Sequence, residues 1–181
     1  MSSNNTFSSQ GLFYLYCFLA YLASGVISYF IFDKLSNDFE ALAYSPGLIF
    51  GLAILVANWK LIEVNMLRKL IFLALSVLAF TLAFYLGLTL FAVKGPMIGP
   101  GAGLIGGGVI ATILFLLYRN RKFQWLRLTP LVSGAIGGFL FFVVLPTHDT
   151  YSSTLSFAVW QVLVGLNVSY ILWNDWKEHS V

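Results

Sequence analysis

Polar side chains recur along one face of the last apolar segment, residues 153–174, and they offer the most chemistry in this sequence. Their spacings of four and seven place them on a single side of an α-helix: Ser156, Trp160, Asn167 and Asn174. Gln161, Gly165 and Ser169 form the adjoining stripe. An unpaired amide or indole N–H is costly in hydrocarbon, so this side of the helix must face protein, water or a ligand.

Two interpretations of this face are open. Interhelical hydrogen bonds, worth about 0.6 kcal/mol per pair, are common in membrane bundles and are the simpler explanation. A tryptophan beside amides could equally bind a small neutral or aromatic solute, by stacking and by orienting hydrogen bonds. The residues proposed for such a ligand site are Trp160, Gln161, Asn167 and Ser156, joined by Gly99 and Gly101 from a glycine-rich segment earlier in the chain.

The two glycines of this proposed site lie at the start of the fourth apolar segment, residues 95–118. Pro96 and Pro100 stand within barely two turns there, so we expect regular helix to begin only after Pro100. The simpler explanation is a helix that enters the membrane after a short turn, because proline is tolerated in a first turn. The alternative is an unwound segment whose free amides and positive helix end face a cavity, as in transporters with broken helices.

Catalytic and metal-binding constellations are missing from the sequence. The two histidines, His148 and His179, cannot build a histidine-rich metal or haem site, and Cys17 has no partner cysteine. Ser133 is followed by glycine, but the sequence lacks the other residues that a rhomboid-type protease needs. No ionisable residue lies deep within a predicted span, which disfavours proton-coupled transport. We therefore predict no cofactor and no metal, and rank an enzyme third among the function classes.

Six apolar segments must position these residues. Of 181 residues, 59% are hydrophobic and 9% are charged, against roughly 25% charged in globular proteins, so polar groups are too few to cover a soluble surface. Each segment is long enough to cross a hydrocarbon core of about 30 Å at about 1.5 Å per residue. The predicted fold class is an all-α integral membrane protein, a compact bundle of six transmembrane helices in one domain, residues 1–181. The predicted spans are 11–32, 45–62, 70–93, 95–118, 126–146 and 153–174; the second is short enough for a re-entrant loop.

Basic residues divide unevenly between the two sides that six alternating spans create. Eight of the ten fall at the N-terminus, the C-terminus and the loops at 59–69 and 119–127, which leaves only Lys34 and Lys94 for the other side. Cytoplasmic loops collect lysine and arginine, so we predict that both termini are cytoplasmic, in the cell (inner) membrane. The net charge of +3 is thereby explained by membrane topology, and no nucleic-acid partner is predicted.

Small residues four apart predict where the helices approach one another closely. The longest stripe belongs to the fourth segment, and shorter ones belong to the second and fifth. The predicted packing residues are Gly95, Gly99, Gly103, Gly107, Ala111, Gly47, Gly51, Gly134 and Gly138. Close helix packing is the simpler explanation of these stripes, and a backbone-lined path or hinge is the alternative.

Two function hypotheses follow. The first is a small solute-binding or solute-conducting protein with its site between the fourth and sixth helices. The second is a non-transporting assembly, immunity or scaffold subunit whose glycine-rich helix faces dock a partner membrane subunit or a second copy of the chain. In size and topology alone, the chain resembles the substrate-binding subunits of energy-coupling-factor vitamin importers, although no substrate motif matches. The lipid bilayer is a predicted partner under either hypothesis.

Overall fold

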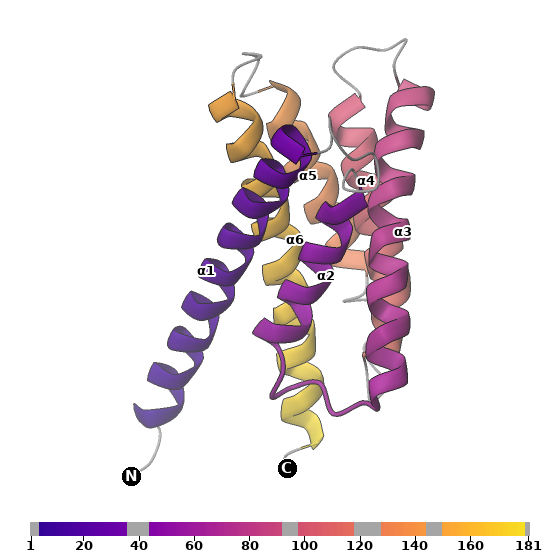
Figure 1. Ribbon diagram of the computed structural model, residues 1–181. Coiled ribbons are helices and arrows are strands. Elements are labelled where there is room, and N and C mark those ends of the chain that lie inside the picture. Colours follow the sequence, from indigo (N-terminus) through magenta and orange to yellow (C-terminus); the bar gives the residue numbers. More distant parts are fainter. Residues whose placement is uncertain (1–3, 36–43, 92–97, 118–127, 144–149, 180–181) are drawn as a thin grey trace.

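The computed structural model describes residues 4–35, 44–91, 98–117, 128–143 and 150–179 (Figure 1). These residues contain no strand and form six α-helices. The helices are α1 (Asn4–Leu35), α2 (Ser45–Ala57), α3 (Met66–Phe91), α4 (Ile98–Ile113), α5 (Thr129–Val143) and α6 (Thr150–His179), and a 3-10 turn, η3 (Leu114–Leu116), follows α4. The all-helical class predicted from the sequence is confirmed.

The helices form a closed ring. Each helix packs against the helices before and after it in the chain, and α6 closes the ring by packing along α1. α2 also contacts α6 across the bundle. The start of α1, the end of α6 and the connection at 58–65 lie at the same end of the molecule (Figure 1). α6 therefore reaches α1, α2 and α5, which makes it the central helix for the candidate site.

Three of the helices are long and apolar enough to cross a membrane. Their apolar windows are Gln10–Ile31, Met66–Ala83 and Phe157–Lys177, in α1, α3 and α6. The other three helices contain shorter apolar stretches, at Ser45–Ala57, Gly101–Ile113 and Thr129–Leu140. The 13 residues of α2 measure only about 20 Å at about 1.5 Å per residue. The part of the chain that the structure describes is thus all-helical, with three helices of membrane-spanning length and three shorter apolar ones.

The end of α2 and the start of α4 differ from the sequence-based expectation in ways that the backbone explains. α2 ends at Ala57, before the predicted limit at residue 62, because the Asn58 carbonyl accepts turn hydrogen bonds from the backbone N–H groups of Leu61 (2.8 Å) and Ile62 (3.1 Å). α4 begins at Ile98, so the expectation that regular helix starts only after Pro100 is wrong. Pro100 lies in the first turn, where its missing N–H removes no helix hydrogen bond.

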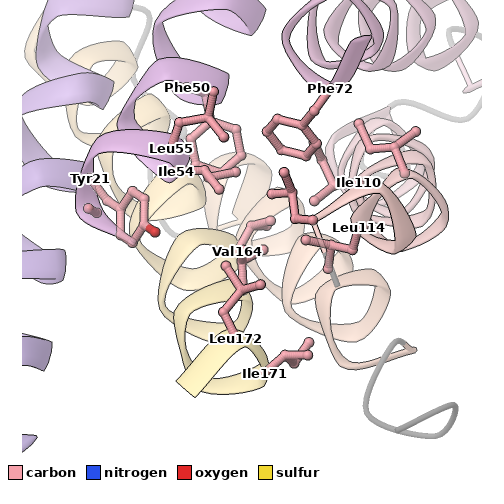
Figure 2. Packing of buried hydrophobic residues seen from close by; sticks show 14 of the residues in the cluster. Tyr21, Phe50, Ile54, Leu55, Phe72, Ile110, Leu114, Val164, Ile171 and Leu172 are labelled. Carbon is pink, nitrogen blue, oxygen red and sulfur yellow. The ribbon is translucent and has the colours of Figure 1, made fainter. Parts of the chain in front are cut away.

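The core is made by side chains from α1, α2, α3, α4 and α6, and Figure 2 shows them pointing toward one another. Tyr21, Phe50, Phe72 and Leu114 are among its largest buried members. Many other large apolar side chains, among them Leu12 at 65% exposure, point outward from the bundle. A folded chain with a packed interior and an apolar exterior matches a lipid solvent, in agreement with the prediction that the bilayer is a partner.

Candidate functional site

Trp160 lies where α6 meets three other helices. A Cβ atom built on Gly106 of α4 would stand 3.0 Å from Trp160 Cζ2, and one built on Gly137 of α5 would stand 3.1 Å from Trp160 Cδ1. The Phe50 ring of α2 approaches the indole with a centroid separation of 5.3 Å. Two helices thus present glycines, with no side chain, to the indole. The indole therefore fills the space that the two glycines leave, and it is only partly buried.

Gln161, the next residue of α6, faces a different neighbour. Its side chain is 1% exposed and bonds two serines of α1: Ser24 Oγ donates to Gln161 Oε1, and Gln161 Nε2 donates to Ser28 Oγ at 3.0 Å. Successive helix residues are about 100° apart, which is enough to point Trp160 toward α4 and Gln161 toward α1. The structure therefore separates these two predicted site residues.

The two asparagines of the predicted polar face bond within their own helix. Asn167 Nδ2 donates to the Leu163 carbonyl at 3.1 Å, and Asn174 Nδ2 donates to the Tyr170 carbonyl at 2.9 Å. Interhelical hydrogen bonding does occur on α6, but its described members are Gln161 and Ser169, from the adjoining stripe. The Asn167 amide is half-buried and lies two turns from Trp160 on the same helical face.

The remaining predicted ligand residues are only partly placed. Gly101 is buried in α4. Gly99 lies in the first turn of the same helix, and Ser156 lies in α6. The surroundings of Gly99 and the side chain of Ser156 lie outside what the structure describes.

The predicted packing glycines of α4 and α5 lie face to face. A Cβ on Gly103 would overlap the Gly134 carbonyl oxygen and stand 3.1 Å from Gly138 Cα. A Cβ on Gly107 would overlap the Pro130 carbonyl oxygen. No room exists at either position for a side chain.

α2 and α3 meet at a second glycine contact. A Cβ on Gly47 would stand 2.7 Å from Val77 Cα, and one on Gly51 would overlap the Ser76 side chain. Ser76 Oγ donates to the Gly47 carbonyl at 2.9 Å, so a hydrogen bond reinforces this close approach. Ala111 is buried on α4, whereas Gly95 lies outside the described residues.

Several buried polar residues were missed from the sequence, among them Ser76, Asn58 and Asp175. Asn58, at the end of α2, is 0% exposed and donates from Nδ2 to the Tyr21 hydroxyl at 2.9 Å. Asp175 is 5% exposed and lies close to the C-terminal limit of the apolar window of α6, so it is buried near the helix end and not deep within a span. Asp175 was passed over because the predicted span ended at residue 174. Asn58 was not selected because the apolar run continues past it to residue 62, so the sequence gives no sign that the helix ends there.

The described residues bring together Trp160, Gly106, Gly137 and Phe50 in one packing contact, and Gln161 with Ser24 and Ser28 as a separate hydrogen-bonded group. Among them no cluster of histidine, cysteine or carboxylate side chains is suited to hold a metal ion. Comparison with known protein families, with curated proteins and with solved structures gave no significant match.

Proposed function

We propose that this chain is a multi-pass protein of the cell (inner) membrane that crosses the bilayer six times and binds a small neutral or aromatic solute beside Trp160. The proposal rests on the Trp160 indole, which is only partly buried although α2, α4 and α5 pack against it, and on the half-buried Asn167 amide on the same face. Aromatic surface with few polar groups is typical of small-molecule sites. Passage of the solute through the bundle would extend the same function.

The glycine contacts give no support to a docking role. Gly103, Gly107 and Gly134 already pack against one another's helices, and Gly47 and Gly51 pack against α3. These glycine faces already pack against other helices of the same chain, so they offer no free surface to a partner subunit. The scaffold hypothesis requires glycine faces that are free to dock a partner, so these glycines do not support it.

Both termini are proposed to be cytoplasmic. The end of the molecule that holds the start of α1 and the end of α6 also holds Lys60, Arg68 and Lys69, on or beside the 58–65 connection (Figure 1). Trp59 lies at the same end, and Lys69 Nζ stands 3.9 Å from the centroid of its ring. Basic side chains together with tryptophan are typical of a cytoplasmic headgroup region.

Cysteine labelling tests this orientation. In a Cys17→Ser background, a cysteine placed at Asn65 should resist an impermeant thiol reagent added from outside, and so should one at Asn120, while one at Asn37 should react. Reaction at Asn120 together with protection at Asn37 would show the opposite orientation. Protection at all three positions even after the membrane is permeabilised would show that these positions do not lie in exposed loops, which contradicts the predicted topology.

Native mass spectrometry of the gently purified protein tests solute binding directly, because a retained molecule adds a defined mass. Asn167→Ala provides the matched variant. Its amide bonds only its own helix, so we expect the intrinsic stability in detergent to change by about 0.5 kcal/mol or less. Stabilisation by the retained solute should be lost, because a ligand stabilises only the state that binds it.

Asn174→Ala is the control for this experiment, since Asn174 makes the same bond to its own helix seven residues further on. It should keep the solute-dependent rise in melting temperature. Absence of any retained solute, or equal loss of stabilisation in both variants, would reject the Trp160 site and return the scaffold hypothesis to first place.

A further inference from the structure

Asn58 occupies a fixed place at the end of α2. Its backbone N–H donates to the Ile54 carbonyl at 3.1 Å, and its own carbonyl accepts from Leu61 and Ile62. The chain turns sharply around this residue while its side chain is 0% exposed. The amide is therefore held inside the bundle by backbone bonds on both sides.

The orientation of the Asn58 amide follows from its hydrogen bonds. Nδ2 donates to the Ile54 carbonyl and to the Tyr21 hydroxyl, both at 2.9 Å. If the amide oxygen and nitrogen were exchanged, Asn58 Oδ1 would face the Ile54 carbonyl oxygen. Neither atom carries a proton, so no hydrogen bond could form between them. The nitrogen thus faces Ile54, and both of its protons are used.

Tyr21 connects Asn58 of this hydrogen-bonded group to α6. Its hydroxyl accepts from Asn58 and lies 2.8 Å from Ser169 Oγ, to which its proton is free to point. Figure 2 shows the Tyr21 oxygen directed toward α6. Cys17, one turn before Tyr21 on α1, is also 0% exposed, and its thiol lies 3.9 Å from the Ala57 carbonyl. Three helices meet at this polar group.

One acceptor in this group has no partner: Asn58 Oδ1 receives no hydrogen bond, although it is fully buried. A buried amide oxygen is nearly always satisfied by protein or by a bound molecule. Flipping the amide would not help, since the flipped nitrogen would then carry two unused protons. Asn58 Oδ1 can therefore accept a hydrogen bond from a further donor.

We propose that Asn58 Oδ1 accepts a hydrogen bond from a bound neutral donor, either water or a small hydroxyl- or amide-bearing solute, where α1, α2 and α6 meet. The hydroxyl of Tyr21 and the apolar side chains around it favour a neutral molecule over an ion, because an ion buried here would have no opposite charge among the bonded groups. A single buried water, with this acceptor as one of its hydrogen-bond partners, is the smallest donor of this kind. This site is independent of the proposed solute site at Trp160.

Cys17 supplies a built-in probe, because it is the single cysteine of the chain and its thiol lies in the same polar group. The infrared S–H band of wild-type protein in lipid discs, followed after transfer to D2O, reports whether water reaches this group. Native mass spectra of the same sample report a retained solute. Asn58→Leu removes the acceptor, and Asn174→Leu is the control.

If water is the occupant, S–H exchange should be rapid in wild type and in Asn174→Leu. It should slow by about tenfold in Asn58→Leu, the factor expected for loss of roughly one hydrogen bond to a bound molecule. If a solute is the occupant, a retained mass should be present in wild type and the control and missing in Asn58→Leu. Slow S–H exchange in wild type together with no retained mass overturns the proposal. So do an exchange rate and a retained mass that are the same in Asn58→Leu as in wild type.

Should Asn58→Leu fail to fold, wild-type protein decides alone. A nuclear Overhauser effect from water, or from a retained solute, to the Asn58 side-chain amide protons supports the site, whereas a retained mass without this contact does not. Absence of any such contact to Asn58 overturns the proposal.

Discussion

Gly103→Ala and Gly107→Ala should each destabilise the protein by about 1–3 kcal/mol or more, the usual cost of overpacking a close contact. The added methyl group would overlap a backbone carbonyl oxygen of α5 in each case, at Gly134 for the first variant and at Pro130 for the second. Backbone atoms cannot rotate aside as a flexible side chain can. The two helices would have to separate, and the measurement is the unfolding free energy or the melting temperature in detergent.

Gly108→Ala is the matched control, since it adds the same methyl group to the same helix. Its Cβ would stand 3.5 Å from Leu131 Cδ1, an ordinary contact with the end of a flexible side chain. The replacement of glycine by alanine also favours helix, by about 1 kcal/mol. Gly108→Ala should therefore be neutral or stabilising, and equal loss at all three positions would mean that α4 and α5 are not held by this glycine contact.

The glycine spacing illustrates what the sequence predicts and where prediction stops. Small residues at intervals of four identify a helical face that permits close approach, and Gly103 and Gly107 lie on such a face. Spacing does not identify the neighbour, because contacts between helices depend on how the ring closes. Gly106, outside the stripe, packs against Trp160 from a helix some fifty residues away and was not selected.

Trp160 and Gln161 show the same limit at the candidate site. Their residue types marked α6 as the helix with polar chemistry, and that inference needed only the cost of polar groups in lipid. Grouping them in one site was an inference from sequence proximity. In the folded chain Trp160 faces α4 and α5 while Gln161 bonds Ser24 and Ser28 of α1.

Asn58 could not have been placed from the sequence, because its role depends on a helix end that apolar composition does not reveal. α2 stops where backbone turn bonds form, and the stop turns this asparagine toward Tyr21, which is 37 positions away in sequence. α4 likewise ends at a 3-10 turn, where the Leu117 N–H donates to the Leu114 carbonyl at 2.9 Å. Hydropathy measures where a chain tolerates lipid, and helix length is set by local backbone bonding.

Gln161→Leu should destabilise the protein by about 1–3 kcal/mol, the cost of leaving buried polar groups without partners. The substitution keeps the side-chain volume similar but strands the hydroxyls of Ser24 and Ser28, both buried on α1. A simple lost pair would cost only about 0.6 kcal/mol in a membrane protein, so the larger value reflects the two stranded hydroxyls. Because α6 closes the helix ring on α1, the expected result is a lower melting temperature in detergent.

A triple variant, Ser24→Ala, Ser28→Ala and Gln161→Leu, tests the reason for that loss. It removes every partner at once, and replacing all members of a hydrogen-bonded group by apolar side chains is often close to neutral. The triple variant should therefore be more stable than Gln161→Leu alone. Asn174→Leu, which gives up only a bond within α6, should cost less than Gln161→Leu. A triple variant no more stable than the single one would show that Gln161 stabilises the α1–α6 contact by its packing and not by its hydrogen bonds.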